Sequence, residues 1–508
     1  MVAGSNNKRI AKNTLMLYIR MFLIMAVTLF SFRIVLKELG EDGYGIYNVV
    51  AGVVILFSFL SSALTQSTQR FLSYHIGRKD FDELKRVFSM CINVHVVIAV
   101  TILILAETIG LWFLNMYMQF PPGMSATANI VYQFSIATFV IQLLVVPYQA
   151  SIISNEKMSF YAYFSIIEAF LKLSAALLLT FITGNKVVVY SAALCIAAIS
   201  ILFCYRFYCR SHFEHCTYRY LFDSKLFKQI LSFSGWNMLG GIGNVGATQG
   251  VNVILNIFMG VALNAAMGVS NQVAGAVSAF VTNMQTAFNP QIIKSYAVED
   301  REYFLSLIFR ASRFSFFLIF IIGFPVILCC STIFDIWLTE TPDYAIPFTQ
   351  LIIIFCMIDA ISGPLWTAAQ ASGNIKTYMI IIASMIFSNV PAAYVILYFG
   401  LSPVWLMAYK VLMNFIIHLT RIGYLHWLIK FPSLVYLRKV MLPIAVFVLV
   451  VVPIPLIMAD FSNTILENIL LMLFTLCESS ILGFYLIMNK EERRFLLEKI
   501  RSMKQRIR

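Results

Sequence analysis

The sequence predicts an all-α integral membrane protein of about 14 transmembrane helices, and three observations support that fold class. Of the 508 residues, 60% are hydrophobic and only 12% are charged, and the mean hydropathy is +0.83. Apolar runs of membrane length recur along the chain as far as residue 489. The longest hydrophilic segments are the loop at 206–228 and the C-terminal tail, which leaves no room for a soluble catalytic domain. We therefore expect no enzymatic activity.

Each predicted span is an apolar run bounded by Gly, Pro, Asn or charged residues. A helix needs about 20 apolar residues to cross the hydrocarbon core of roughly 30 Å. By that measure the spans are 14–36, 44–66, 86–111, 126–150, 160–183, 187–209, 229–257, 262–288, 304–333, 346–370, 377–399, 402–428, 437–458 and 464–489.

The basic residues predict the orientation. If the N-terminus is cytoplasmic, 31 of the 37 Lys and Arg residues fall on that side of the predicted spans. Acidic residues gather in the opposite loops. The positive-inside rule then predicts a multi-pass chain with both termini in the cytoplasm. This distribution explains the net charge of +13, so we expect no nucleic-acid partner.

Short matches between the two halves of the chain predict an internal repeat. Asn48–Gly52 matches Asn271–Gly275, Pro147 matches Pro364, and Asn155 matches Asn374, all at offsets of 217 to 223 residues. An even number of spans separates the copies, so the repeats are expected to run parallel. The predicted organisation is two six-helix lobes, 1–215 and 216–432, followed by an extra helix pair and a basic cytoplasmic tail, 433–508.

The first span carries two arginines, Arg20 and Arg33. A guanidinium in the membrane costs about 2.5 to 3.5 kcal/mol on insertion scales unless it snorkels, pairs or faces water. Arg20 lies about two turns inside the predicted cytoplasmic end, and we interpret it as a cavity residue suited to bidentate contact with phosphate. Arg33 lies near the external end beside Lys37. There we favour snorkelling, with cavity charge as the alternative.

The seventh span has a polar face. Asn237, Gly241, Asn244, Thr248 and Asn252 recur at steps of four, three, four and four residues, which places them on one side of a helix. We interpret this face as the lining of a substrate cavity. The alternative is a helix-packing seam, because several glycines in the same span also allow close approach.

Five further charged positions lie inside predicted spans. Glu168 is expected to pair with Lys172 at i,i+4. Asp359 is either an ion-coupling site or a buried partner of Lys410, which is itself a candidate substrate contact. The remaining ion-coupling candidates are Glu168 and Glu478.

The histidine and cysteine residues match no recognisable functional motif. His95 is expected to bond between helices. The nine cysteines form no CxxC pair. Cys209, His212, His215 and Cys216 are metal-capable types, but their spacing fits no zinc pattern. No metal site and no cofactor are expected.

Together, the arginine in the first span, the LGEDGYGIYNVVAG segment at 39–52, the QRFLSYHIGRKD segment that follows it and the two-lobe plan resemble the multidrug/oligosaccharidyl-lipid/polysaccharide (MOP) exporter superfamily. The resemblance covers nearly the whole chain and points to the branch of polysaccharide repeat-unit flippases. The acidic residues of 39–52 themselves predict a short external turn that opens the second span.

The resemblance also implies a function. Members of this branch move undecaprenyl-diphosphate-linked oligosaccharides across the bacterial inner membrane by alternating access, for O-antigen or lipopolysaccharide synthesis. It would make Arg20 a diphosphate contact, and it implies membrane lipid, the lipid-linked substrate and a polysaccharide polymerase or assembly protein as partners. A proton or sodium gradient would drive transport.

Two alternatives stay open within the superfamily. The first is the MATE branch, whose members export small molecules by cation coupling. They carry a functional aspartate in the first helix, whereas this chain has no acidic residue between Lys12 and Lys37. The second is a lipid II flippase, which differs from the leading hypothesis only in the sugar that it carries.

Overall fold

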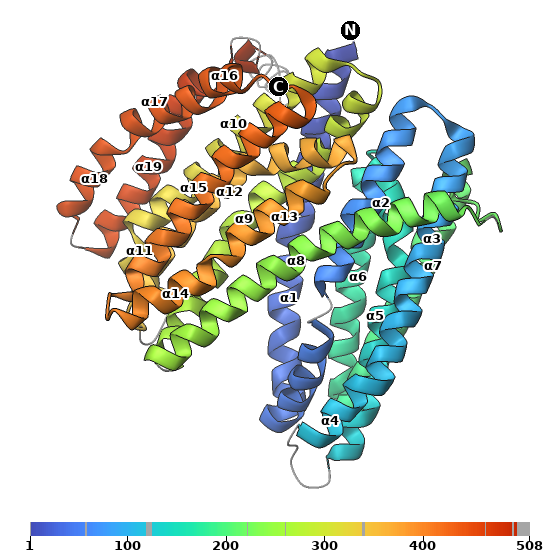
Figure 1. The fold of residues 1–508 in the computed structure, drawn as a ribbon. Helices are drawn as coiled ribbons and strands as arrows, with labels where there is room; N and C mark the ends of the chain where they lie inside the picture. Colours follow the sequence, from blue (N-terminus) through green and yellow to red (C-terminus); the bar gives the residue numbers. More distant parts are fainter. Residues whose placement is uncertain are drawn as a thin grey trace, which may run out of the picture. The chain divides into compact units, whose positions relative to one another are not determined.

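The computed structural model describes residues 2–55, 58–117, 124–220, 222–259, 261–337, 341–462, 464–489 and 492–494. These residues are helical almost throughout and form no strand (Figure 1). Eleven of the described helical segments are long and apolar enough to cross a membrane. The chain is therefore an all-α, multi-pass integral membrane protein, and the predicted fold class is confirmed.

The predicted count of about 14 spans is not confirmed. The predicted spans 229–257 and 262–288 lie in α8 (Ser224–Met259) and α9 (Val261–Ala297), which are not among those eleven. The predicted span 44–66, of which 56–57 lie outside the described residues, has no counterpart among them. Glycine and side-chain amides are frequent in α8 and α9, as in Asn244 and Asn252. These residues lower the hydropathy of a segment without preventing it from being helical.

Two compact units make up the structure. The first comprises Met1–Ile242 with Asn289–Asp300, and the second comprises Gly243–Phe288 with Arg301–Arg508. Helices α8 and α9 therefore each contribute to both units. The predicted lobes 1–215 and 216–432 and the pair 433–508 stay a prediction.

In chain order, the helices are α1 (Val2–Ile55), α2 (Ser58–Arg78), α3 (Phe81–Leu105), η1 (Ala106–Gly110), α4 (Leu111–Tyr117), α5 (Ser125–Ser154), α6 (Met158–Leu178), η2 (Leu179–Phe181), α7 (Lys186–His212), η3 (Glu214–Cys216), α8 (Ser224–Met259), α9 (Val261–Ala297), α10 (Arg301–Leu328), α11 (Cys330–Trp337), α12 (Ala345–Ser372), α13 (Lys376–Phe387), α14 (Asn389–Tyr398), α15 (Pro403–Ile429), α16 (Ser433–Tyr436), η4 (Leu437–Met441), α17 (Leu442–Val451), α18 (Pro453–Asp460) and α19 (Ile465–Leu486).

Within α1, two helices meet at Gly40, in the segment expected to form an external turn. The backbone leaves the helical region only at Gly40, where φ is 68° and ψ is 177°, and it is helical again as far as Ile55. A positive φ costs glycine little because glycine has no Cβ. The turn predicted over 39–52 is thus a one-residue kink.

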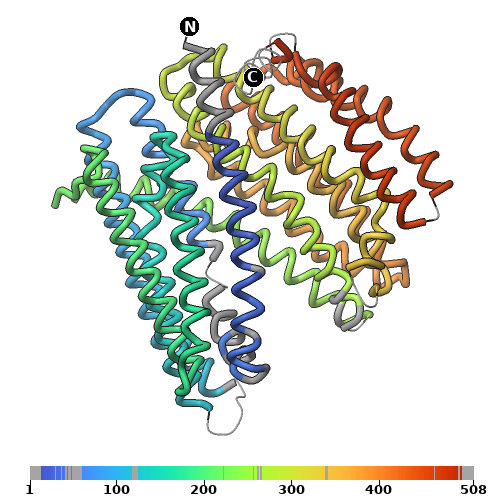
Figure 2. The backbone as a smooth tube through the Cα atoms, turned by 180° about the vertical axis from the view of Figure 1, so that it is seen from behind, coloured from blue at the N-terminus to red at the C-terminus, as the bar shows by residue number. Residues whose placement is uncertain are grey.

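In the first unit, α1 runs along α6 and α5 packs against α7 (Figure 2). Side chains from α1, α6 and α7 form a buried cluster that includes Val35, Ala176 and Tyr190. The side chain of Asn185 caps α7 by accepting a hydrogen bond from the backbone N–H of Val188, 3.3 Å away. This packing places residues of α6 and α7 beside the first helix.

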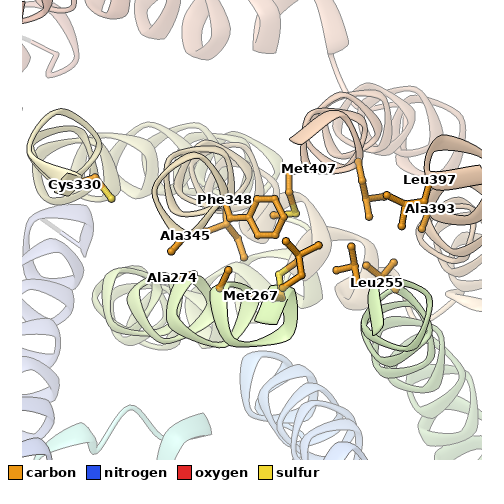
Figure 3. Packing of buried hydrophobic residues seen from close by; sticks show 14 of the residues in the cluster. Leu255, Met267, Ala274, Cys330, Ala345, Phe348, Ala393, Leu397 and Met407 are labelled. Carbon is orange, nitrogen blue, oxygen red and sulfur yellow. The ribbon is translucent and has the colours of Figure 1, made fainter. Parts of the chain in front are cut away.

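The second unit has its core among α8, α9, α11, α12, α14 and α15. Figure 3 shows Phe348 beside Met267 and Met407 in this core, with Leu255 and Leu397 nearby. The last long helix, α19, packs on α10 through a stripe of buried residues four positions apart. The stripe consists of Leu471, Thr475, Ser479 and Gly483.

Matched residues of the predicted repeat occupy equivalent local positions. Pro147 lies inside α5 and Pro364 inside α12, in each case near the helix C-terminus. Asn155 and Asn374 lie in the short connections that follow those helices. The placement of these residues agrees with the predicted repeat, which stays a prediction.

Candidate functional site

The guanidinium of Arg20 stacks on an aromatic ring inside the first unit. Its Cζ lies 4.5 Å from the centroid of the Tyr161 ring. Arg20 is half-buried on α1 and Tyr161 is in the first turn of α6, so the packing of these two helices creates the contact. A cation over an aromatic face contributes about 0.5 to 2 kcal/mol. The ring also restricts the plane of the guanidinium, which matters for contacts with a bidentate acceptor.

A buried tyrosine lies next to this stack. Tyr205 of α7 is 2% exposed, and its hydroxyl is hydrogen-bonded to Ser165. The Ser165 hydroxyl also donates to the Tyr161 carbonyl over 2.9 Å. Arg20 and Glu168 are both close enough to act electrostatically on the Tyr205 phenol. These five residues and Lys172, the ion-pair partner of Glu168, are called the Arg20 cluster below: Arg20, Tyr161, Ser165, Glu168, Lys172 and Tyr205.

The Arg20 cluster carries a positive balance of charge. The carboxylate of Glu168 pairs with Lys172 on the next turn, with 2.8 Å between Oε1 and Nζ, as predicted. Two cations and one carboxylate therefore lie together. Because charges interact more strongly near an apolar medium than in water, this balance favours an anionic group. The role of Glu168 in ion coupling stays a prediction.

Arg33 lies outside the Arg20 cluster. Its side chain is exposed on α1, as is that of Lys37 one turn later. Exposure fits the interpretation of an interfacial anchor, and the role of Arg33 stays a prediction.

The polar face predicted on α8 is divided between the two units. Asn237 belongs to the first unit and is 5% exposed, and its amide donates to the Phe233 carbonyl over 3.2 Å. Asn244 and Thr248 belong to the second unit and are exposed, while Asn252 is half-buried. The Thr248 hydroxyl donates to the Asn244 carbonyl over 2.9 Å, and the Asn252 amide donates to Gln249 Oε1 over 3.4 Å. The Asn244 side chain is exposed, whereas Asn237 is enclosed.

The same helix also has a packing seam, on a different face. An ideal Cβ at Gly243 would lie 3.1 Å from the Ala383 Cβ, and one at Gly250 would lie 2.9 Å from a Val390 methyl. These glycines let α8 approach α13 and α14 closely. The two interpretations of the seventh span therefore describe different faces of one helix.

Asp359 and Lys410 do not pair with each other. Asp359 is exposed on α12, and Lys410 is half-buried on α15 with its Nζ 6.0 Å from the Phe355 ring centroid. Among the described residues neither forms an ion pair, although both act on the thiol of Cys356. The prediction of a buried Asp359–Lys410 pair is wrong, because the two side chains flank Cys356 from different helices.

A second polar group surrounds Tyr378, which the sequence analysis did not identify. Tyr378 is 1% exposed and stacks on Trp366, with 5.2 Å between ring centroids. Arg421 and Asp359 both act electrostatically on its phenol. The Arg421 Nε and the Tyr378 hydroxyl are buried and have no hydrogen-bond partner among the described residues. This Tyr378 group lies wholly in the second unit.

Glu478 is a further intramembrane acid of the second unit. It is half-buried on α19, and its Oε2 is buried without a hydrogen-bond partner in the described part of the chain. His95, in contrast, has a hydrogen-bond partner in its own helix, because its Nδ1 lies 2.7 Å from the Cys91 carbonyl oxygen. The prediction of an interhelical bond at His95 is wrong, since the helix turn supplies the partner.

A buried ion pair holds the end of α9 in the first unit. The Glu156 side chain is 1% exposed, and its Oε1 lies 2.6 Å from the Nζ of Lys294. Gln291 donates to the other carboxylate oxygen, and Asn13 donates to the Glu156 carbonyl over 3.2 Å. Glu156 itself has a left-handed backbone with φ of 60°. A single acidic residue thus connects α1, the α5–α6 junction and α9.

Aromatic rings lie close to the guanidinium of Arg70 in the first unit. Its guanidinium lies 4.8 Å from the Phe71 ring centroid and 5.0 Å from that of Tyr74. Burial lowers the pKa of Arg70 to about 10, against the opposing effect of the Tyr74 and Tyr296 phenols. Arg70 therefore remains charged near neutral pH.

Comparison with known proteins gives fold relatives and no sequence family. No protein-family model matches the chain, and no curated protein matches its sequence. Solved structures do match. A MATE protein in complex with MaD3S has a TM-score of 0.72 at 14% identity, with 84% of this chain and 97% of that chain covered.

Two other solved structures are similar to the same extent. One is a MOP superfamily transporter from Pyrococcus furiosus, described as having a binding pocket of reverse polarity. Its TM-score is 0.71 at 14% identity, and the match covers 82% of this chain and 94% of that chain. The MATE transporter ClbM in complex with Rb+ has a TM-score of 0.70 at 16% identity, with coverage of 81% and 94%. The fold is therefore that of MATE transporters of the MOP superfamily.

Proposed function

We propose that this chain is a membrane exporter that moves undecaprenyl-diphosphate-linked oligosaccharide repeat units across the bacterial inner membrane by alternating access. The observation that carries the proposal is the Arg20 cluster, which presents a stacked guanidinium and a positive balance of charge inside the first unit. Both termini would be cytoplasmic. A polysaccharide polymerase or assembly protein would receive the exported unit.

The chemistry of the substrate matches the cluster. A diphosphate is anionic and offers pairs of oxygens to the fork of a guanidinium. The hydroxyl-rich sugars suit amide and hydroxyl groups, such as Asn244 and Thr248 on the exposed face of α8. The polyprenyl tail would stay in lipid. Lipid II presents the same diphosphate, so the two flippase hypotheses share this site and differ in the sugar.

A second candidate function, cation-coupled export of a small molecule, is favoured by other observations. The similar structures are of MATE transporters, and ClbM is described in complex with Rb+. Asp359 is exposed on α12 and lacks an ion pair among the described residues, so its carboxylate is available to a proton or a cation. The first predicted span, 14–36, carries Arg20 and no acid, which supports an anionic substrate over a cationic drug.

Complementation separates these functions. The chain is expressed in bacterial strains that lack either the repeat-unit flippase or the lipid II flippase, and surface polysaccharide, peptidoglycan synthesis and dye efflux are measured. Return of the surface polysaccharide is the expected result, and Arg20→Ala should abolish it. Return of peptidoglycan synthesis alone would assign lipid II as the substrate. Increased dye efflux with neither polymer restored would overturn the flippase hypothesis in favour of the MATE alternative.

A further inference from the structure

Two cysteines approach each other at the C-terminal end of α7, beginning one turn beyond Tyr205 of the Arg20 cluster. The backbone N–H of Phe213 donates to the Cys209 carbonyl over 2.9 Å, and that of Cys216 donates to the Phe213 carbonyl over 3.0 Å. These two turns bring Cys216 back toward Cys209, and the two thiols are close enough to affect each other's ionisation. The Cys209 thiol donates to the Tyr148 carbonyl over 3.5 Å. Both thiols are free and buried.

A histidine and a serine complete the arrangement. The Ser151 hydroxyl of α5 lies 2.7 Å from the Nε2 of His215 and 3.2 Å from the Sγ of Cys216. His215 is 6% exposed. Ser151 therefore links the imidazole to the thiol, in the manner of a proton relay. No group of metal-ligating side chains large enough to hold an ion occurs among the described residues.

We propose that Cys209 and Cys216 form a redox site that a small hydroperoxide converts to a disulfide. Burial by itself raises the pKa of Cys216, but the neighbouring Cys209, His215 and Ser151 side chains lower it below its ordinary value. The thiolate is the reactive form of cysteine, so Cys216 is the attacking sulfur. Burial of both sulfurs favours a small oxidant over a bulky disulfide.

The reaction has two steps. The Cys216 thiolate attacks one oxygen of the hydroperoxide, the O–O bond breaks, and the other oxygen leaves as water or alcohol after taking up a proton. Cys216 is then a sulfenic acid. The Cys209 thiol attacks this sulfur, an S–S bond forms, and the sulfenic oxygen leaves as water with the Cys209 proton. Two thiols thus lose two electrons and two protons, which the hydroperoxide accepts.

Mass spectrometry of the full chain tests the site. The reduced protein in detergent is treated with hydrogen peroxide, its remaining thiols are alkylated, and its peptides are analysed. We expect Cys209 and Cys216 to be joined before any other pair and to separate with dithiothreitol. Ser151→Ala should slow the linkage roughly tenfold by breaking the relay. Cys204→Ser, which removes a cysteine outside the Cys209–Cys216 site, should leave the rate of linkage unchanged.

Two results would overturn the proposal. One is the absence of the Cys209–Cys216 link while other cysteines are oxidised. The other is linkage at the same rate in the denatured chain, which would show that sequence proximity suffices. Cys209→Ser offers a separate measurement in the folded protein: Cys216 should then accumulate as a sulfenic acid that dimedone traps, and its failure to do so would remove Cys216 as the attacking sulfur.

Discussion

The two units treat their charged residues differently. In the first, charges are fixed by neighbours: Arg20 stacks on Tyr161, Glu168 pairs with Lys172, and Glu156 pairs with Lys294. In the second, the intramembrane charges at positions 359, 410 and 478 form no ion pair with described residues. The ion pairs among its described residues instead lie where α10 meets Glu492, with Arg310 and Arg313 as the cations.

This difference suggests that the charged residues of the two units have different roles in transport. A charge held by an aromatic ring and a neighbouring helix is ready to bind a ligand without rearrangement. A charge with no fixed partner responds more readily to a proton, a cation or a change in solvation. We therefore expect substitutions in the Arg20 cluster to affect substrate binding and substitutions at Asp359 to affect the energy source.

The largest effect is expected at Arg20. Removing one partner of a desolvated charge pair costs about 2 to 5 kcal/mol, so Arg20→Ala should reduce transport of the lipid-linked oligosaccharide by roughly 100-fold or more. Transport into proteoliposomes measures this effect. Arg33→Ala is the matched control on the same helix, and its rate should stay within about twofold of the wild type. Equal losses in both variants would contradict a specific role for Arg20.

Glu156→Gln should destabilise the first unit. Breaking a buried ion pair by removing one partner costs about 3 kcal/mol, because Lys294 keeps its charge without the carboxylate. Thermal unfolding in detergent should show a lower midpoint. Glu214→Gln is the control, since its side chain is 94% exposed and 3.9 Å from Lys85. The charge reversal of both Glu156 and Lys294 should recover part of the loss, and a midpoint unchanged in Glu156→Gln would refute the assignment.

Asp359→Asn should remove dependence on an ion gradient while leaving exchange without a gradient intact. One coupled charge supplies about 2.3 kcal/mol per 100 mV of membrane potential, so loss of coupling should lower gradient-driven accumulation up to roughly 50-fold. Accumulation is measured in proteoliposomes with imposed proton or sodium gradients. The same ion dependence in Asp359→Asn and wild type would exclude Asp359 as the coupling residue.

The smallest effect is expected at Tyr161. Tyr161→Leu removes the ring beneath Arg20 and should weaken binding by about 1 kcal/mol, roughly fivefold, whereas Tyr161→Phe keeps the ring and should bind almost normally. Substrate concentration dependence of transport distinguishes the two. If both variants bind like the wild type, the stack does not orient the guanidinium.

The fold class was predictable because spanning a bilayer requires long apolar helices, and these leave a clear record in composition and hydropathy. The number of spans was less predictable, because α8 and α9 contain side-chain amides and glycines that lower the hydropathy of regular helices. The kink at Gly40 was predicted as a longer turn because the acidic residues after it resemble a loop.

The candidate site was predictable only in part. Arg20 stood out because an arginine inside an apolar run needs an explanation. Tyr161, Glu156 and Tyr378 carried no such signal, since a tyrosine near a helix end and an acid in a short connection are common. Their roles depend on contacts between residues far apart in the chain, such as Glu156 with Lys294, and those contacts come from packing.

The most direct measurement of the central claim is the binding of undecaprenyl diphosphate, without sugars, to the purified protein. It isolates the proposed contact between the diphosphate and the Arg20 cluster from carbohydrate recognition and from coupling. The account predicts saturable binding by the wild type and by Arg33→Ala, and a dissociation constant roughly 100-fold higher for Arg20→Ala. Equal affinity in the wild type and Arg20→Ala would contradict it.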